Sequence, residues 1–260
     1  MKFTRKNGMA AIEIEPQYVN LDRAKEIVNN LSSSDGRIYP IPYSFIKSDT
    51  LDTLNIVMQA LGLYTFPTIE LCEWLSSQID DDPELEPHSA IEICGGTGWI
   101  GRQLGIPTTD IKNMENPVVE KIMLESFSVP TIYAKDVETL EATEAVNKYK
   151  PDIVIGSYVT SKQLVNKIDK KRAITIGFRM PGGGVIEQNL MDLARKEVKV
   201  GVDVKGIIRK VYKTILVCNM RTHKNESYVN LPHQSYSFPW LVTRGDLTQA
   251  RILVFENKSW

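Results

Sequence analysis

Apolar residues in the first 88 positions recur at helical spacing wherever a pattern is visible. Leu21–Leu31 and Leu51–Leu63 repeat apolar side chains three and four positions apart, which predicts two amphipathic helices. Residues 48–50 ("SDT") supply N-cap candidates for the second helix. The stretch "FPTIELCEWLSSQI" (66–79) predicts a third helix, and the proline at its second position suits a first helical turn.

From Ala90 onward, patterns of strand length and helix length alternate. The apolar runs of strand length are Ala90–Cys94, Thr131–Ala134, Asp152–Ile155 and Ala173–Phe178. The helical stretches among them are Pro117–Ser128, Val137–Lys148, Ser161–Lys171 and Val185–Lys196. Such alternation is typical of a mostly parallel sheet with helices on both faces, because parallel strands need crossover connections. The predicted fold class is therefore α/β and Rossmann-like.

The alternation stops after Val198. Two strand-like runs, "GIIRKVYKTILVCNM" and "ARILVFENK", are separated by a polar and aromatic loop without a helix. Two strands joined in this way predict an antiparallel strand at one edge of the sheet. Upstream, the acidic and proline-broken "DDDPELEPH" (80–88) is predicted to be a solvated linker. We therefore expect a helical N-terminal extension at 1–87 and a Rossmann-like domain at 88–260.

Composition excludes several function classes. The formal net charge is −1, so attraction to nucleic acid requires a local basic patch. Cys72, Cys94 and Cys218 are widely spaced, and no Cys/His cluster accompanies them, so neither a zinc site nor a disulfide framework is expected. The start of the chain lacks the apolar core of a signal peptide, and no apolar run approaches the ~20 residues of a membrane span. A cytoplasmic protein without a bound metal is expected.

The segment "IEICGGTGWIGRQLGIPTTDIKN" carries the clearest functional signal, and it has two interpretations. In the first, Gly95, Gly98 and Gly101 form a loop that resembles the dinucleotide-binding loop of extended short-chain dehydrogenases. "YVTSK" then places Tyr158 and Lys162 at the spacing of the catalytic pair of that family. This interpretation predicts an NAD(P)-dependent oxidoreductase.

In the second interpretation, the loop resembles the acid-x-Gly-x-Gly-x-Gly loop of class I S-adenosylmethionine-dependent methyltransferases. Glu92 is the acid, and Cys94 replaces the first glycine. In that family the first acid helps to fix the loop and the methionine end of the cofactor. A second acid after strand two binds the ribose hydroxyls, and a third after strand three approaches the adenine. Asp110 and Asp136 match these two acids, and the resemblance covers residues 88–260.

The resemblance implies a set of site residues and a role for the extension. The implied cofactor-binding residues are Glu92, Cys94, Gly95, Gly96, Thr97, Gly98, Asp110, Ile111, Asp136, Val137 and Gly156. Ser157 and Tyr158, after strand four, are the expected floor of the substrate site and the candidate catalytic residues. The N-terminal extension is expected to cover the substrate, as such extensions do in methyltransferases.

Charge, spacing and position favour S-adenosylmethionine over a dinucleotide. Glu92 would repel a pyrophosphate, whereas it attracts a sulfonium or ammonium by about 4 kcal/mol at ~4 Å and an effective dielectric of ~20, before desolvation. Only 63 residues (158 − 95) separate Gly95 from Tyr158, about two βα units fewer than in the dehydrogenase family. That family also begins at its glycine loop, whereas 94 residues precede Gly95 here.

The spacing after the loop departs from both families. Gly98 and Asp110 are twelve residues apart, which leaves room for a helix of barely two turns. Asp110 therefore has a second interpretation as an N-cap or turn acid.

The sequence does not identify the methyl acceptor, and a small molecule, RNA and protein all stay open. The Asn/Asp-Pro-Pro-aromatic stretch of amino-group DNA methyltransferases and the Pro-Cys nucleophile of cytosine-C5 enzymes are both missing. Lys199–Lys224 holds seven Lys and Arg residues against one acid. The aromatic residues Tyr228, Tyr236, Phe238 and Trp240 follow it. These features suit stacking on bases, or else a solvated face beside an ordinary aromatic cluster.

Two loops add weaker candidates. "FRMPGGGVIEQN" places Arg179 and Gly182–Gly184 at the C-terminal edge of the sheet, where three glycines suit a lid, an anion-binding nest or a simple turn. His233 is a candidate general base, or a loop histidine without a catalytic task. Methyl transfer depends mainly on alignment, so a site without an obvious catalytic residue suits an enzyme. It equally suits a catalytically inactive relative that binds a partner.

Overall fold

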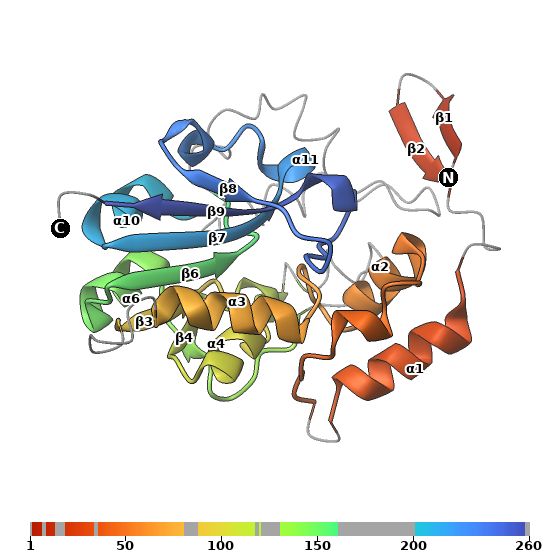
Figure 1. The fold of residues 1–260 in the computed structure, drawn as a ribbon, viewed down its shortest axis with the longest axis horizontal. Coiled ribbons are helices and arrows are strands. Elements are labelled where there is room, and N and C mark those ends of the chain that lie inside the picture. Colours follow the sequence, from red (N-terminus) through yellow and green to blue (C-terminus); the bar gives the residue numbers. More distant parts are fainter. Residues whose placement is uncertain are drawn as a thin grey trace.

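The computed structural model describes most of the chain and places it in a layered α/β fold (Figure 1). The described residues are 2–6, 9–13, 19–33, 36–80, 88–117, 120, 131–160 and 201–257. The predicted elements at 161–171, 173–178 and 185–196, and most of the predicted helix at 117–128, lie outside these residues.

The helices and strands follow one another in this order. The first part contains β1 (Lys2–Lys6), β2 (Met9–Glu13), α1 (Leu21–Leu31), η2 (Tyr43–Phe45), α2 (Leu51–Ala60) and α3 (Ile69–Ile79). The middle part contains β3 (Ala90–Ile93), α4 (Trp99–Leu104), β4 (Thr108–Asp110), η3 (Asn113–Glu115), β5 (Glu138–Thr139), α6 (Ala142–Tyr149) and β6 (Ile153–Ser157). The last part contains α10 (Val204–Lys210), β7 (Lys213–Asn219), α11 (Met220–His223), η4 (Ser227–Asn230), β8 (Gln234–Tyr236), η5 (Leu247–Gln249) and β9 (Ala250–Glu256).

Seven of these strands form one sheet in the order β5-β4-β3-β6-β7-β9-β8. The first five are parallel, and β9 runs antiparallel to both of its neighbours. The chain starts in the middle with β3, adds β4 and β5 on one side, and then crosses to β6 and β7 on the other. The point between β3 and β6 is therefore a topological switch point, where ligands bind at the carboxyl ends of the strands in open α/β sheets. The predicted fold class is confirmed.

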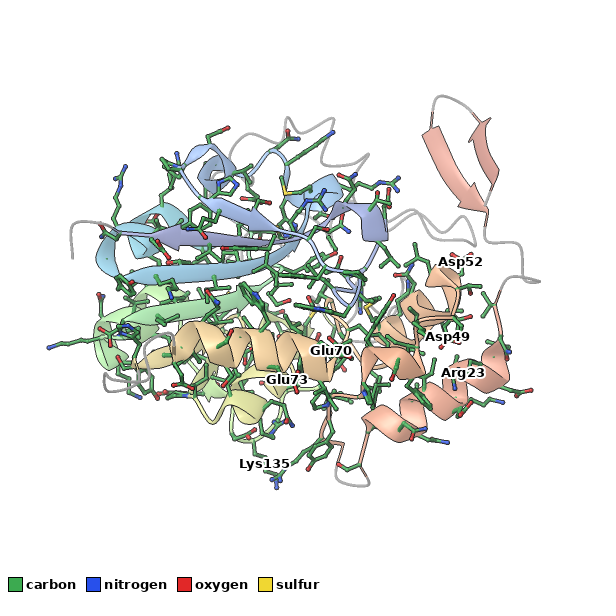
Figure 2. All side chains as sticks on the ribbon, in the orientation of Figure 1. Arg23, Asp49, Asp52, Glu70, Glu73 and Lys135 are labelled. Atoms are coloured by element: carbon green, nitrogen blue, oxygen red, sulfur yellow. The ribbon has the colours of Figure 1, made fainter. Side chains whose placement is uncertain are left out.

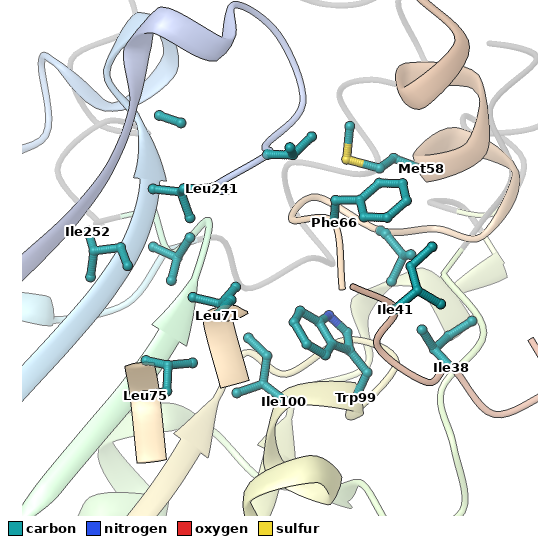
Figure 3. Packing of buried hydrophobic residues seen from close by; sticks show 14 of the residues in the cluster. Ile38, Ile41, Met58, Phe66, Leu71, Leu75, Trp99, Ile100, Leu241 and Ile252 are labelled. Atoms are coloured by element: carbon teal, nitrogen blue, oxygen red, sulfur yellow. The ribbon is translucent and has the colours of Figure 1, made fainter. Parts of the chain in front are cut away.

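Helices cover both faces of the sheet, because successive strand residues point to opposite sides. In β6, Ile153 and Ile155 belong to the core cluster beneath α1–α4, whereas Val154 belongs to the cluster beneath α6 and α10. Figure 3 shows the first cluster, where Leu71 and Leu75 of α3 lie near Ile252 of β9. The parallel strands are buried on both faces, as expected for such sheets.

The N-terminal helices agree with the sequence pattern and share this core. α1 has the predicted bounds, and α2 begins after Thr50, whose side chain caps it by accepting a hydrogen bond from the amide of Thr53. α2 ends three residues early, just before Gly62, which has a φ of 66°. α3 begins at Ile69 with Thr68 as its cap, three residues later than predicted, so Pro67 precedes the helix and does not lie in its first turn. One continuous apolar cluster joins α1–α3 to the sheet, and the β1–β2 hairpin was not predicted.

The third strand differs from the prediction. Residues 131–134 form no strand, and the strand paired with β4 is the two-residue β5. The predicted helix at 137–148 is the shorter α6, which begins after Glu141 caps it. A strand of two residues leaves no periodic pattern in the sequence, which explains the error. Among the described residues, no helix is both long and apolar enough to cross a membrane.

Candidate functional site

A glycine loop leads from β3 into α4 at the switch point. Cys94, Gly96 and Gly98 all have positive φ angles, of 53°, 55° and 71°. This backbone conformation is costly for a residue with a side chain, so Cys94 is the strained member. A Cβ added at Gly96 would be in ordinary van der Waals contact with Thr131 Cγ2, at 3.6 Å. Gly96 is therefore favoured by its positive φ and not by a lack of room for a side chain.

The other two glycines of the loop pattern are required by packing within the protein. A Cβ on Gly95 would lie 2.2 Å from Thr108 Cγ2, and one on Gly101 would lie 1.9 Å from Thr108 Oγ1. Gly98 stands against Val137 in the same way, at 2.6 Å from its Cγ2. The glycine spacing therefore reflects how closely α4 packs on β4, and not only the approach of a ligand.

Glu92 is buried and engaged within the fold. It is 1% exposed, and its Oε2 accepts hydrogen bonds from the Gly101 amide (2.8 Å) and from Thr108 Oγ1 (2.9 Å). Burial raises the pKa of this carboxyl to about 7, against which those two hydrogen bonds act. Glu92 therefore ties α4 to β4 and shapes the loop from below.

Asp110 ends β4 and meets the glycine loop. Its Oδ2 accepts a hydrogen bond from the Gly96 amide (3.0 Å), and its Oδ1 accepts one from the Lys112 amide (2.7 Å). Burial raises its pKa, and the two amides oppose that rise. The Tyr133 side chain also hydrogen-bonds to Asp110. The contact with the Lys112 amide is that of a turn acid, as the second interpretation of Asp110 predicted. A carboxylate has about four lone-pair sites, so these three donors leave capacity for about one more. Ile111, the next residue, is half-buried beside it.

Asp136 lies just before β5 and pairs with an arginine of α4. Arg102 donates to it from Nε (3.1 Å) and from Nη2 (2.9 Å), and also from Nη2 to the Thr97 carbonyl (3.4 Å). The Arg102 hydrogen bonds hold the pKa of Asp136 below its usual range. Asp136 is exposed, whereas Val137 is buried against Gly98. This pair fastens the loop from its outer side.

The end of β6 faces the glycine loop across the switch point. Gly156 is buried and pairs with Ile93 of β3, and Ser157 Oγ lies 2.7 Å from Thr65 Oγ1. Tyr158 has a φ of 56°, so the residues that follow both β3 and β6 are non-glycine residues in the left-handed region. Such strain persists only where the surroundings impose it, and it clusters at functional sites.

Tyr158 lies within a polar and aromatic cluster that the sequence analysis did not find. Its hydroxyl donates to the Arg244 carbonyl (2.5 Å), and its ring lies 5.3 Å from that of Tyr64 and 4.8 Å, edge-on, from that of His223. Burial raises the pKa of Tyr158 to about 12 and lowers that of His223. His223 Nε2 is buried without a hydrogen-bond partner among the described residues. These neighbours are more than 60 residues away in sequence, and no local motif marks them.

The segment between α2 and α3 spans the same edge. The Gly62 carbonyl accepts from Thr131 Oγ1 (3.2 Å), on the side of the glycine loop, and Thr65 meets Ser157 at the end of β6. The Phe66 amide donates to the Val242 carbonyl (2.9 Å). The N-terminal extension therefore lies across the switch point, and whether it covers a substrate stays a prediction.

The basic stretch at 199–224 does not form one patch. Arg209 and Lys210 precede β7, whereas Arg221 and Lys224 follow it, and seven strand residues put about 20 Å between the two pairs. Lys213 is buried, with its Nζ donating to the Gln78 carbonyl. Lys199 lies outside the described residues. Nucleic-acid binding through this stretch stays untested.

The aromatic residues after it divide into two groups. Tyr228 is fully buried and donates to the Val159 carbonyl, so it is a core residue and not a stacking surface. Tyr236, Phe238 and Trp240 are half-buried, and the last two rings stack at 4.3 Å. The His233 ring packs against Phe255, which pairs with a residue near the amino end of β7. Asp110 lies at the carboxyl end of its strand, so His233 is too far away to act as a general base at this site.

Other sequence candidates are absent from this edge or outside the described residues. Lys162, Arg179 and Gly182–Gly184 belong to 161–200, which the structure does not describe. Within the described residues, no three His, Cys, Asp or Glu side chains gather as a metal site, and all three cysteines are free.

Comparison with known proteins adds little. No protein-family model matches the chain, and no curated protein matches it. Among solved structures, it is similar to the 16S rRNA methylase RmtB, with 13% sequence identity over 92% of this chain and 76% of that one. The TM-score is 0.29, so this likeness carries no argument about the present chain.

Proposed function

We propose that the chain binds S-adenosylmethionine at the switch point and transfers its methyl group to an acceptor near Tyr158. The contact between Asp110 Oδ2 and the Gly96 amide, at 3.0 Å, carries this proposal. It joins an acid at the end of the second strand of the parallel sheet to the loop after the first. That is the relation that the resemblance to class I methyltransferases implies for a ribose-binding acid.

The residues at this edge suit a cationic ligand. Asp110 is the acid beside the loop that supplies a negative charge, because the pKa of Glu92 is raised to about 7 and Asp136 is paired with Arg102. A sulfonium or ammonium gains from this arrangement, whereas a pyrophosphate is repelled by it. Asp110 keeps acceptor capacity for a hydroxyl donor.

Each residue has a separate task in this proposal. Asp110 accepts a hydrogen bond from a ribose hydroxyl while it holds the Gly96 amide in place. Glu92 supports the loop through α4 and β4 and does not need to touch the ligand. Asp136 forms an ion pair with Arg102 and so holds the glycine loop in place. Its predicted contact with adenine is not part of the proposal. When bound, S-adenosylmethionine supplies an electrophilic methyl group.

The acceptor is placed beside Ser157 and Tyr158. The hydroxyl of Tyr158 already donates to the Arg244 carbonyl, and its raised pKa keeps it protonated near neutral pH. Tyr158 therefore positions the acceptor as a neutral hydrogen-bonding and aromatic wall, and does not act as a base. The segment that includes Thr65 limits water access, which favours alignment of the acceptor with the methyl group.

The same features weigh against the dehydrogenase alternative. A tyrosine that transfers a proton works best with a pKa near the operating pH, whereas burial raises the pKa of Tyr158 to about 12. In dinucleotide-binding sheets of order 3-2-1-4-5-6, the strand next to strand five is parallel to it. Here the antiparallel β9 occupies that position.

Calorimetric titration of the purified protein with S-adenosylmethionine, S-adenosylhomocysteine, NAD and NADP tests the proposal. We expect micromolar binding of the two adenosyl ligands and none of the dinucleotides. Binding of NAD or NADP alone would overturn the proposal and return Tyr158 and Lys162 to the role of catalytic pair. Binding of the adenosyl ligands with no turnover against a broad acceptor panel would favour an inactive relative.

A further inference from the structure

Arg244 is a half-buried arginine beside the proposed acceptor position. It belongs to the loop before β9, and its main chain binds both sides of the site: its carbonyl accepts the Tyr158 hydroxyl, and its amide donates to the Tyr64 carbonyl (2.9 Å). Its guanidinium lies over the Tyr64 ring, with Cζ 4.3 Å from the ring centroid. In Figure 1 this dark blue loop runs beside the orange end of α2, where Arg244 Nη2 donates to the Met58 carbonyl (2.9 Å).

The hydrogen bonds of this guanidinium are incomplete. A guanidinium has five N–H donors, and within the described part of the chain Arg244 uses one of them. Its Nε is buried without an acceptor, and no acidic side chain of the described residues forms an ion pair with it. A buried donor without an acceptor is costly, so proteins normally provide a partner for a group such as this Nε.

The chain itself contains the completed form of this arrangement. Arg23 also lies over an aromatic ring, that of Phe45 at 4.3 Å, and its Nη2 also donates to a main-chain carbonyl, that of Phe45. In addition, Arg23 Nε and Nη2 each donate to Asp49, at 3.0 Å. Figure 2 shows Arg23 and Asp49 side by side. Arg244 has the ring and the carbonyl, but no described residue supplies the carboxylate.

We infer that Arg244 binds an anionic group, a carboxylate or a phosphate, on the molecule that accepts the methyl group. The guanidinium fork matches the two oxygens of such a group, as it does with Asp49 at Arg23. The identity of the ligand as the acceptor rests on the proposed methyl transfer, whereas the anion site itself does not.

The surroundings favour a small ligand with one such group over a polyanion. The Arg209–Lys210 and Arg221–Lys224 pairs stand at opposite ends of β7, so these described basic residues form no continuous track to Arg244. The Tyr64 ring lies against one face of the guanidinium, so an anion binds at the edge that carries the N–H groups. A nucleic acid would need several phosphate contacts in register.

Anion titration of three full-length variants and the wild type tests the inference. Inorganic phosphate and malonate serve as probes, at constant ionic strength set with sodium chloride. We expect saturable binding to the wild type, at least tenfold weaker binding to R244Q, and a smaller loss in R244K, which keeps the charge but not the fork. R251Q is the matched control, because Arg251 is also half-buried and donates to carbonyls. We expect its affinity to stay within about twofold.

Several outcomes would overturn the inference. They are no saturable binding of either anion by the wild type, equal losses in R244Q and R251Q, or no loss in R244Q. If R244Q does not fold, NMR of the wild type provides the test. The Arg244 Nε–Hε signal is assigned by its absence in R244K, and a bound anion must shift it. Preference for phosphate over malonate, or the reverse, identifies which anionic group is bound.

Parallel titration with S-adenosylmethionine separates this inference from the proposed function. If the wild type binds S-adenosylmethionine but neither anion, only the inference about Arg244 is refuted. If it binds an anion but not S-adenosylmethionine, only the proposed function is refuted. If R244Q weakens S-adenosylmethionine itself tenfold, Arg244 binds the cofactor carboxylate, and its assignment to the acceptor is wrong. Tighter binding of single-stranded RNA than of phosphate, lost in R244Q, would also contradict the small-ligand assignment.

Discussion

Three acids on neighbouring strands have different environments: Glu92 lies within β3, Asp110 ends β4 and Asp136 precedes β5. Glu92 is buried and receives two hydrogen bonds from within the fold, and Asp136 is exposed and paired with Arg102. Asp110 lies between these extremes, bound by two amides but still half-buried at the edge. Their chemistry therefore differs: one titrates near neutral pH, one stays ionised, and one remains able to bind a ligand.

The raised pKa of Glu92 gives a pH dependence of stability. The folded state keeps a proton on this carboxyl up to about pH 7, whereas the unfolded state loses it near 4.5. Its contribution is therefore fully present below about pH 4.5 and is lost as the pH rises through 7. We expect the free energy of unfolding of the wild type to fall by about 3 kcal/mol relative to E92Q over that range. Urea unfolding at pH 4.5, 6, 7 and 8 measures it, and a constant difference would contradict the raised pKa.

Asp110 carries the prediction for cofactor affinity. D110N keeps the shape of the side chain and removes its charge, so we expect S-adenosylmethionine to bind about tenfold to a hundredfold more weakly, since hydrogen bonds to charged groups are worth ~1.5–3 kcal/mol. E144Q, in an exposed position of α6, is the control and should leave affinity unchanged. Circular dichroism checks the fold, and an unchanged dissociation constant in D110N would refute the ribose role.

The sequence predicted Asp110 at the end of a strand, and it ends β4. For Asp136 the sequence was wrong about the preceding strand, because residues 131–134 form none. It did not predict their environments, because Arg102, Thr108 and Tyr133 reach them from other elements. The aromatic and polar neighbours of Tyr158 were missed for the same reason. The strain at Cys94 could be inferred in part, since the family pattern has a glycine there.

At the scale of elements, the glycine pattern allows α4 to pack closely against β4. α4 has only six residues, and its closeness to β4 depends on the missing side chain of Gly101. The sequence predicted a helix of barely two turns here from the short distance between Gly98 and Asp110, and this is correct. The third strand was predicted at the wrong residues, because β5 is defined by its pairing with β4 and not by a pattern of apolar residues in its own sequence.

At Gly101 we therefore expect an effect on stability opposite to the one that helix propensity predicts. Replacing glycine with alanine inside a helix normally stabilises it by about 1 kcal/mol. In G101A the new Cβ would lie 1.9 Å from Thr108 Oγ1 and 3.0 Å from Glu92 Oε2, so we expect destabilisation by about 2 kcal/mol. Thermal and urea unfolding measure it. The cost should be smaller when G101A is introduced into a T108A background, and equal costs in both backgrounds would show that the contact is not responsible.

At the scale of the whole molecule, the N-terminal extension and the sheet form one hydrophobic core. Figure 3 shows Met58 and Phe66 of the extension in the same cluster as Trp99 and Ile100 of α4. The sequence marked a boundary near residue 88 because the linker composition changes there. It gave no sign that α3, which precedes the linker, covers one face of the sheet that follows (Figure 1), since which surfaces meet depends on the fold as a whole.

A shared core predicts a single cooperative transition. Trp74 and Trp99 lie in or against this core, whereas the far-ultraviolet signal reports all helices and strands. We expect the denaturation curves from tryptophan fluorescence and circular dichroism to coincide. We also expect a fragment of residues 88–260 to lack cooperative unfolding, because Ile153, Ile215 and Ile252 would lose their cover. Separate transitions, or a fragment that unfolds cooperatively, would contradict the single core.

The two outermost strands of the sheet also affect behaviour at high concentration. β5 has two residues and β8 has three, and Pro232 and Pro239 flank β8 closely on either side. Proline has no amide hydrogen to donate, and short edge strands offer few free groups for another chain to pair with. The long and strongly apolar strands are all interior. The sheet is therefore protected at both sides against growth by strand addition, which disfavours amyloid-like assembly from the native state.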